Sequence, residues 1–298
     1  MAAHAKEKIG TLPVVRSVAA LRHEVSRWRN AGKTVALVPT MGALHAGHLA
    51  LVERGRALSD RVIASLFVNP AQFAPHEDFA RYPRDEASDA AKLAAARTDL
   101  LYAPPLEEIY PPGFATIVDV GAIAAGQDGH FRPGHFRGVA TVVAKLLLQA
   151  RPDIACFGEK DYQQLQVVKR LVRDLDIPVR IEGVATVREP DGLALSSRNL
   201  YLSPAERAVA PALYRVLGET AARLEAGEAA APALADAATA LMRAGFAKID
   251  YVEACDALTL ATLERADRPG RLLAAAWLGK TRLIDNVPVA SAAGASQR

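Results

Sequence analysis

Two histidines spaced three residues apart form the most chemically suggestive pair in the chain. His45 and His48 close the segment Pro39–His48, which reads PTMGALHAGH. On the first turn of a helix, this spacing turns both imidazoles toward the same side. Beside the free N–H groups of a helix start, such imidazoles could donate hydrogen bonds to a phosphorus transition state, and each well-placed donor contributes about 3–4 kcal/mol. The alternative is a helix cap in which both rings only satisfy backbone groups.

Two further polar segments carry groups suited to a nucleotide. Gly158–Asp161 offers the ammonium of Lys160 for phosphate and the carboxylate of Asp161 for ribose hydroxyls. Taken alone, this segment equally fits a charged turn with Asp161 as a helix N-cap. Ser196–Arg198 adds two hydroxyls and a cation, a combination that is also common in ordinary loops.

The elements expected around these segments alternate between strands and helices. Apolar runs suited to buried strands fall at residues 34–39, 61–68, 100–103, 154–157 and 179–184. Helical patterns fall between them, at about 18–28, 48–58, 85–97, 139–147 and 165–175, with Ser17 as the first N-cap. This alternation predicts the α/β class, with a Rossmann-like, doubly wound parallel sheet. Ligands bind such sheets at the carboxyl ends of the strands, where the first two polar segments lie.

The chain changes character after about residue 199. Ser203-Pro204-Ala205-Glu206 is a capping box, and it predicts one helix from 204 to about 226. A second helix is expected at 233–244, closed by Gly245, followed by antiparallel strands at 249–253, 271–278 and 281–286. We therefore expect a Rossmann-like domain over residues 1–186 and a smaller α+β domain over residues 187–298.

The composition excludes several classes of protein. The 298 residues include 36 Lys and Arg against 33 Asp and Glu, a balance that argues against nucleic acid or a membrane surface as a partner. Cys156 and Cys255 alone cannot build a disulfide framework or a zinc site. Residues 1–10 lack the apolar core of a signal peptide, and no apolar run approaches the roughly 20 residues of a membrane span. We expect a soluble cytoplasmic protein.

The segment Pro39–His48 resembles the HIGH motif of nucleotidyltransferases and class I aminoacyl-tRNA synthetases. As a whole string it is most similar to the pantoate–β-alanine ligase family. Further blocks similar to that family follow in order: Phe67–Phe73, Tyr82–Arg84, Arg132–Val139, Phe157–Gln164 and Gly192–Asn199. Two positions depart from the family pattern, namely Leu195, where the family usually has Met, and the turn Gln127–His130.

The resemblance implies a reaction, its substrates and an assembly. ATP would activate the carboxylate of (R)-pantoate to pantoyl adenylate, and β-alanine would displace AMP to form pantothenate. ATP would be a substrate, Mg²⁺ would accompany it, and the chain would form a homodimer. An exposed apolar strand at 61–68, extended by 69–73, could contribute to the dimer interface. The N-terminal domain would bind nucleotide and pantoate, and the C-terminal domain would act as a lid.

The resemblance also assigns the site residues. The catalytic residues would be His48, His45, Lys160 and Arg198. Residues of the ATP site would be Pro39, Met41, Gly42, Ala43, Leu44, His45, Ala46, Gly47, His48, Gly158, Glu159, Lys160, Asp161, Val187, Leu195, Ser196, Ser197 and Arg198. The substrate site would comprise Gln72 and Gln164, which hold pantoate, with Thr40, Asn69, Tyr82 and His135.

A metal site is harder to read from the residues. Asp85, Glu86 and Asp89 lie at an expected helix start, where acidic side chains are favoured by the helix dipole in any case. Mg²⁺ bound to phosphates needs only one or two protein carboxylates, and Asp89 is the candidate ligand.

Two other functions fit the same residues. The chain could be a different adenylyltransferase of the HIGH superfamily, or a nucleotide-binding homologue without catalysis. The neutral amides of Gln72 and Gln164 favour a substrate with a carboxylate and hydroxyls. The intact His45, His48, Lys160 and Arg198 favour catalysis.

Overall fold

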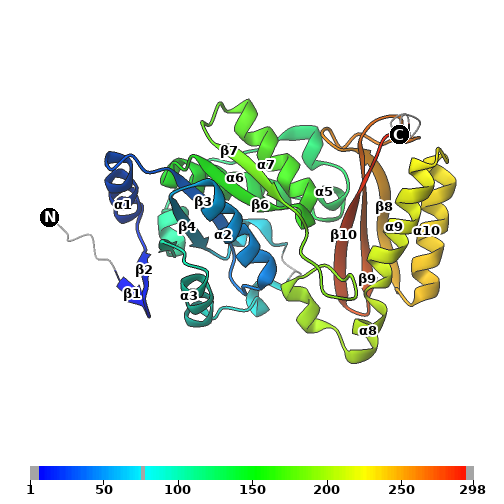
Figure 1. Ribbon diagram of the computed structural model, residues 1–298, viewed down its shortest axis with the longest axis horizontal. Coiled ribbons are helices and arrows are strands. Elements are labelled where there is room, and N and C mark those ends of the chain that lie inside the picture. The colour runs from blue at the N-terminus through cyan, green and yellow to red at the C-terminus, as the bar shows by residue number, and fades with distance from the viewer. Residues whose placement is uncertain (1–6, 75–77, 293–298) are drawn as a thin grey trace. The chain divides into compact units, whose positions relative to one another are not determined.

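The computed structural model describes residues 7–74 and 78–292 (Figure 1). Residues 1–6, which belong to the N-terminal segment examined for a signal peptide, lie outside the described residues. The chain divides into two compact units. Unit 1 comprises Met1–Ala124, Arg132–Glu159 and Val167–Ala185, and unit 2 comprises Ala125–Phe131, Lys160–Gln166 and Thr186–Arg298.

A seven-stranded sheet forms the centre of unit 1 in the described residues, with the order β1-β2-β5-β4-β3-β6-β7. All neighbours from β2 to β7 pair in parallel, and β1 pairs antiparallel with β2. The strands are β1 Glu7–Ile9, β2 Leu12–Val15, β3 Val35–Thr40, β4 Arg61–Leu66, β5 Leu100–Tyr102, β6 Ile154–Gly158 and β7 Arg180–Val184. The predicted doubly wound α/β fold is confirmed. The sequence pattern did not reveal β1 and β2, which have only 3 and 4 residues.

Helices cover both faces of this sheet (Figure 1). The long helices of unit 1 are α1 Val18–Asn30, α2 Ala46–Leu58, α3 Glu86–Ala95 and α6 His135–Ala150, and α4 Leu106–Ile109 is a short one. Helix α7 Tyr162–Asp174 begins in a segment of unit 2 and continues in unit 1, and the short helix α5 Asp128–Phe131 belongs to unit 2. The core between α2, α3 and the strands includes Leu51, Val52 and Leu93. Among the described residues none of the helices has the length and apolar character that crossing a bilayer requires.

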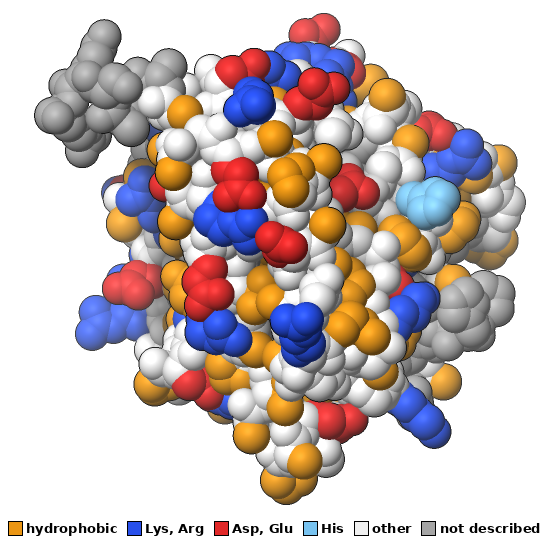
Figure 2. Space-filling model, turned by 90° about the vertical axis from the view of Figure 1, so that its right-hand side faces the viewer, with side chains coloured by type: hydrophobic (Ala, Val, Ile, Leu, Met, Phe, Trp, Pro, Cys, Tyr) orange, Lys and Arg blue, Asp and Glu red, His pale blue; other side chains and the backbone are white. Residues whose placement is uncertain are grey.

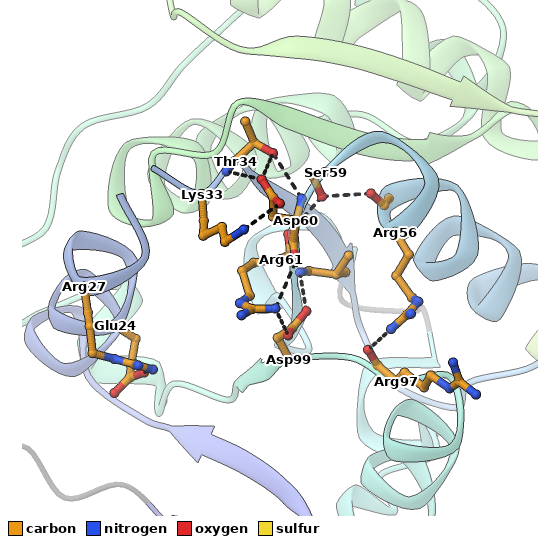
Figure 3. Close-up of polar contacts among 12 residues, drawn as sticks. Glu24, Arg27, Lys33, Thr34, Arg56, Ser59, Asp60, Arg61, Arg97 and Asp99 are labelled. Atoms are coloured by element: carbon orange, nitrogen blue, oxygen red, sulfur yellow. Dashed lines mark hydrogen bonds and ion pairs between the residues drawn. The ribbon is translucent and has the colours of Figure 1, made fainter. Parts of the chain in front are cut away.

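Two aspartates accept hydrogen bonds at the amino ends of the central strands, as Figure 3 shows. Asp60 accepts the backbone N–H and the hydroxyl of Thr34, both at 3.0 Å, and the Lys33 ammonium at 3.2 Å. Asp99 accepts the backbone N–H of Val62 at 2.9 Å. These contacts tie the start of β3 to β4 and the start of β4 to β5. The register of the strands is thereby set at the edge opposite the candidate site.

The order of the strands reverses between β3 and β6. From β3 the chain adds β4 and β5 on one side, and then returns to add β6 and β7 on the other. Ala36 and Leu37 of β3 pair with Ile154 and Ala155 of β6, so the two strands are neighbours in the sheet. Ligands of doubly wound sheets bind outside such a reversal. The polar segments that follow β3 and β6 begin there.

Unit 2 contains an antiparallel sheet in the order β10-β9-β8, with helices packed on one face (Figure 1). Its strands are β8 Lys248–Asp256, β9 Gly270–Leu278 and β10 Thr281–Val289, and its main helices are α8 Pro204–Val209, α9 Ala212–Glu225 and α10 Ala230–Ala244. The three predicted antiparallel strands are confirmed. Figure 2 shows the side of α10, where acidic and basic side chains are interspersed with hydrophobic ones.

The prediction of one helix from 204 to about 226 is wrong. The capping box at Ser203 forms as expected, with Ser203 accepting the Glu206 N–H at 3.3 Å, but α8 ends at Val209 and α9 begins at Ala212. Pro211 lies at the break, because proline has no N–H for the helical ladder and its ring collides with the preceding turn. The predicted end of α10 is confirmed, with Gly245 in the left-handed conformation at φ 114°.

The expected exposure of the strand at 61–68 is also wrong. β4 pairs with β3 on one side and β5 on the other. Val62, Ile63 and Ala64 are each 0% exposed. The apolar run is needed for the interior of the sheet, so these residues cannot form a dimer interface.

Candidate active site

A tight turn joins β3 to α2. Gly42 and Ala43 both have positive φ angles, of 90° and 52°, and His45 is the N-cap of α2 with an extended backbone. Thr40, a predicted substrate residue, donates its hydroxyl to the Ser65 carbonyl at 2.7 Å. Because Gly42 and Ala43 have positive φ angles, the chain changes direction within a few residues between the end of β3 and the first turn of α2.

The two histidines form a reciprocal capping box at the start of α2. Nδ1 of His45 accepts the Gly47 N–H at 3.2 Å, and Nδ1 of His48 accepts the His45 N–H at 3.3 Å. The ring centroids lie 4.1 Å apart, so the spacing places the imidazoles side by side as predicted. A ring nitrogen that accepts an N–H carries no proton, so the neutral rings hold theirs on Nε2. The histidines thus cap the helix through Nδ1, and each neutral ring carries its proton on Nε2.

The backbone N–H groups of this turn are largely engaged within the protein. His45 and Gly47 donate to the imidazoles, and His48 donates to the His45 carbonyl at 2.9 Å. Ala43 and Leu44 donate to the buried carboxylate of Asp89 at 2.9 and 2.8 Å. The expectation of free N–H groups is therefore wrong at these five positions. The neutral imidazoles add an Nε2–H group each to the donors of this segment.

Asn69 and Gln72 form a buried amide pair after β4. They lie on the 3-10 turn η1 (Pro70–Gln72) and its N-cap, and are 1% and 9% exposed. The Asn69 side chain donates to Gln72 Oε1 at 3.0 Å, and Gln72 Nε2 lies 3.2 Å from Met41 Sδ. The structure thus brings three predicted site residues together. Amides held in this way can recognise a carboxylate and hydroxyls.

Tyr110 is a residue of this cluster that sequence reasoning missed. Its hydroxyl donates to Asn69 Oδ1 at 2.8 Å. Burial raises the pKa of Tyr110 to about 12, so the hydroxyl stays protonated and donates at neutral pH. Its position 41 residues after Asn69 carries no local signal in the sequence.

His135 supports the backbone of Gln72. Its Nδ1 lies 2.8 Å from the Gln72 carbonyl, and its Nε2 lies 3.0 Å from the guanidinium of Arg132. A guanidinium can only donate, so Nε2 accepts and Nδ1–H donates to the carbonyl. Gly138 brings α6 close to the same turn, because a Cβ there would overlap the carbonyl of Ala71. Tyr82 packs its ring edge-on against Phe73, with centroids 6.0 Å apart.

In unit 2, the predicted cations Lys160 and Arg198 line one pocket. Ser196 and Asn199 contribute to its polar wall, and the remaining lining residues are Leu193, Ala194, Leu213, Arg282, Leu283, Ile284 and Asp285. Ser196 caps the turn Ser197–Tyr201 by accepting the Arg198 N–H at 3.2 Å. A pocket lined by three cations, Lys160, Arg198 and Arg282, and by the Ser196 hydroxyl suits the negative charge of phosphate.

Sequence reasoning missed Arg282 and Asp285 in this pocket. Asp285 binds the guanidinium of Arg188 through both oxygens, at 2.7 and 2.9 Å, and Arg282 donates to Asp128 and Asp250 at 2.7 Å each. Burial raises the pKa of Asp250, but hydrogen bonds led by that of Arg282 outweigh it and leave the pKa below its ordinary value. Most of these pairs join residues about a hundred positions or more apart, so no local pattern marks them.

The other predicted residues of unit 2 have simpler surroundings. The Val187 carbonyl accepts the Leu195 N–H at 3.0 Å, which brings two predicted ATP residues together. Gln164 is half-buried on α7, and its neighbour Gln163 is buried and accepts the Asp128 N–H at 3.0 Å. The predicted site residues are therefore divided, with His45, His48 and Gln72 in unit 1 and Lys160, Gln164 and Arg198 in unit 2.

Comparison with known proteins places the chain among ligases. It matches the family described as pantoate–β-alanine ligase over residues 13–288. A pantothenate synthetase of Paramagnetospirillum magneticum is 62% identical over 276 residues, which cover 93% of this chain and 97% of that protein. The crystal structure of a pantothenate synthetase from Thermus thermophilus has a TM-score of 0.84 to this structure at 49% identity, and covers 93% of this chain and 99% of that one.

A further crystal structure adds information about ligands. The pantoate–β-alanine ligase of Francisella tularensis, complexed with β,γ ATP and β-alanine, has a TM-score of 0.78 at 33% identity, and covers 93% of this chain and 97% of that one. The extent and level of these similarities agree with the motif blocks found in the sequence. The chain therefore belongs to the pantoate–β-alanine ligase family.

Proposed function

We propose that the chain condenses (R)-pantoate with β-alanine to pantothenate at the expense of ATP. A carboxylate oxygen of pantoate attacks the α-phosphorus, the bond from that phosphorus to the bridging oxygen breaks, and pyrophosphate leaves. The amine of β-alanine then attacks the acyl carbon of pantoyl adenylate and loses a proton, and AMP leaves. The observation that carries this proposal is the pair of imidazoles at the β3–α2 turn, which lies at the reversal of the strand order.

The substrate itself is the nucleophile, so the protein needs no activated serine or cysteine. Its task is to position the reactants and to stabilise charge on the phosphates. His45 and His48 would donate through Nε2 to phosphate oxygens, and Lys160 and Arg198 would neutralise the same triphosphate. The capping box supports donation of a hydrogen bond rather than transfer of a proton, because Nδ1 of each ring already accepts a backbone N–H.

Pantoate recognition falls to the neutral amides. Gln72, with Asn69 behind it, would meet the hydroxyls and carboxylate of pantoate, and Gln164 would complete the set. The buried pair of Asn69 and Gln72 supports this assignment, because its hydrogen bond to Tyr110 keeps the amides in a defined orientation. A fixed donor and acceptor pattern favours a hydroxylated acid over an apolar one.

Mg²⁺ is part of the proposal as the cation that accompanies ATP, to which it binds chiefly through phosphate oxygens and waters. Asp89 fits such an ion poorly, because it is 1% exposed and both its oxygens accept backbone N–H groups. No group of three or more His, Cys, Asp or Glu side chains suited to a metal lies within residues 7–74 and 78–292. The ligand role of Asp89 stays a prediction, and no step above depends on it.

Assembly and location complete the proposal. We propose a homodimer, on the family resemblance. We also propose a cytoplasmic location, because ATP is available there. Light scattering of the purified protein should give twice the chain mass of 31.7 kDa. A value equal to one chain mass would contradict the proposed homodimer.

One incubation tests the reaction. The protein is mixed with ATP, (R)-pantoate and β-alanine, and products are identified by mass spectrometry. Pantothenate and AMP in equal amounts are expected, with neither formed when pantoate is omitted. An adenylyltransferase of the same superfamily would release pyrophosphate without AMP, and a non-catalytic homologue would release neither. Either result would overturn the proposed function.

A further inference from the structure

The turn before the histidines has a backbone that L-amino acids rarely adopt. Ala43 has a φ of 52°, a region in which a side chain is crowded by its own backbone, and Gly42 before it has a φ of 90°. Successive N–H groups in such a conformation point to one side and form a small anion-binding concavity. In this chain the concavity is made by the N–H groups of Ala43 and Leu44.

The anion that occupies the concavity is a side chain of the protein. Asp89, from the first turns of α3, accepts the Ala43 N–H through Oδ2 at 2.9 Å and the Leu44 N–H through Oδ1 at 2.8 Å. The residue is 1% exposed. Gly42 leaves room for it, because a Cβ at that position would lie 3.0 Å from Asp89 Oδ2. The carboxylate therefore compensates the strained backbone on which the histidine cap is built.

Lys92 completes the contact from the same helix. Its ammonium donates to the Leu44 carbonyl at 2.9 Å and lies 3.8 Å from Asp89 Oδ1. Leu44 is thus bound through both its N–H and its carbonyl, directly before the N-cap His45. Two side chains of α3 therefore hold the peptide groups of Ala43 and Leu44, which directly precede His45 in the chain.

We propose that Asp89 is a positioning residue for the two histidines, acting through the Gly42–Leu44 turn, with Lys92 as its partner. This inference rests on the proposed function of the histidines and deepens it. It assigns the carboxylate to the backbone of the turn instead of to a Mg²⁺ ion. The role requires no contact between Asp89 and either substrate.

The test compares Asp89→Asn with Asp85→Asn as a matched control. Asp85 is exposed at the start of the same helix and its carboxylate accepts the Ser88 N–H at 2.9 Å, so its replacement weakens the start of α3 without touching the turn. Measured are thermal unfolding, kcat and KM for ATP and pantoate, and the Mg²⁺ concentration that gives half the maximal rate. Nitrogen-15 NMR of histidine-labelled protein without ATP, assigned with His45→Gln and His48→Gln, reports the two rings.

A positioning role predicts a specific pattern. In Asp89→Asn, kcat should fall by about 100-fold, as expected for a misplacement of catalytic groups by roughly 1 Å. The half-saturating Mg²⁺ concentration should stay unchanged, and the ring signals of His45 and His48 should shift. Asp85→Asn should show none of these changes. A rise of about tenfold or more in half-saturating Mg²⁺, with the rate restored at high Mg²⁺, would identify a metal ligand and overturn the inference. Wild-type kcat with wild-type ring signals would overturn it as well.

Lys92→Met serves as a second variant in case Asp89→Asn does not fold. Lys92 is half-exposed, with 42% of its side chain accessible, so its loss is tolerable for the fold. A positioning role predicts a lower kcat for this variant. A metal-binding Asp89 predicts an unchanged kcat and a lower half-saturating Mg²⁺ concentration, because a competing cation has been removed.

The two proposals fail in distinguishable ways. If the wild-type protein forms no AMP from ATP, pantoate and β-alanine, the proposed function is wrong. The histidine signals of the ATP-free Asp89→Asn variant still decide whether the carboxylate holds the turn. If the wild-type protein is active and those signals do not move, only the positioning role is lost.

Discussion

At the scale of the residue, the unusual feature is a helix capped by histidines. Serine, threonine, aspartate and asparagine are the common N-caps, since their short side chains reach the first N–H groups. Here His45 and His48 take both halves of a capping box, each through Nδ1. The cap orients the rings and leaves the proton on Nε2. One pair of side chains can therefore cap the helix and carry an N–H donor on each of two neighbouring rings, so a helix cap and a phosphate-binding role are compatible.

Removal of one ring tests this arrangement. His48→Ala should lower the rate of pantoyl adenylate formation by at least about 100-fold, because it removes a fixed donor to the phosphate and the acceptor for the His45 N–H. A single-turnover assay with ATP and pantoate measures this step. His23→Ala, an exposed histidine of α1, is the control and should leave the rate unchanged. A wild-type burst in His48→Ala would exclude the residue from the mechanism.

At the scale of the element, the strands are fixed at the edge away from the candidate site. Asp60 illustrates this, since its contacts to the backbone and hydroxyl of Thr34 join the starts of β3 and β4 (Figure 3). Hydrogen bonds from the Thr34 backbone, the Thr34 hydroxyl and Lys33 lower the pKa of Asp60 from 3.8 to about 2. A carboxylate with a lowered pKa stabilises the folded state while it is charged.

The pH dependence of Asp60→Asn follows from that sign. The stabilisation is fully present above the unfolded pKa of 3.8 and is lost as the pH falls through the folded pKa of about 2. The variant should therefore melt below the wild type at pH 6, and the difference should shrink as the pH falls from about 4 toward 2. Glu107→Gln, an exposed position on α4, is the control for loss of one charge. A difference that stays constant down to the lowest pH would contradict the assignment.

Much of the fold follows from local patterns, and the exceptions have physical causes. Ser17 caps α1, Ser203 caps α8 and Gly245 closes α10, because each residue acts on its own neighbours. The break at Pro211 was readable from the proline itself, and it was missed because the apolar spacing on both sides suits a helix. The strands β1 and β2 are too short for a periodic pattern.

The candidate site likewise combines contacts that local spacing predicts with contacts that it does not. His45 and His48 could be paired from their spacing. The contact of Asp89 with Ala43 and Leu44 joins residues 46 and 45 positions apart, and that of Arg188 with Asp285 joins residues 97 apart. Such contacts arise when the strands are ordered and the helices packed, so their partners are not marked by neighbouring residues.

At the scale of the whole molecule, each of the two compact units contains one buried cysteine, whose reactivity reports on the opening of that unit. Cys156 lies on β6 of unit 1 and Cys255 on β8 of unit 2, and both are 0% exposed. Burial raises the pKa of Cys156 to about 11 and that of Cys255 to about 12, so at pH 8 neither is a thiolate in the folded protein. Reaction with a thiol reagent requires each unit to open.

Native protein at pH 8 should react with a thiol reagent at least about 100-fold more slowly than protein unfolded in urea. Cys156→Ala and Cys255→Ala, each with one thiol left, separate the opening rates of the two units. Immediate reaction of either thiol in the native protein would show that its strand is not protected.

The path of the chain has a consequence for splitting the protein. A gene cut after codon 185 yields an N-terminal piece that holds all of unit 1, but the C-terminal piece lacks residues 125–131 and 160–166 of unit 2. In the C-terminal piece, Arg282 would lack its ion-pair partner Asp128. Arg271 would lack the ring of Tyr162, whose centroid lies 4.2 Å from the guanidinium carbon. The two halves would therefore differ in a complementation experiment, because the first contains every segment of unit 1 and the second needs two segments that only the first contains.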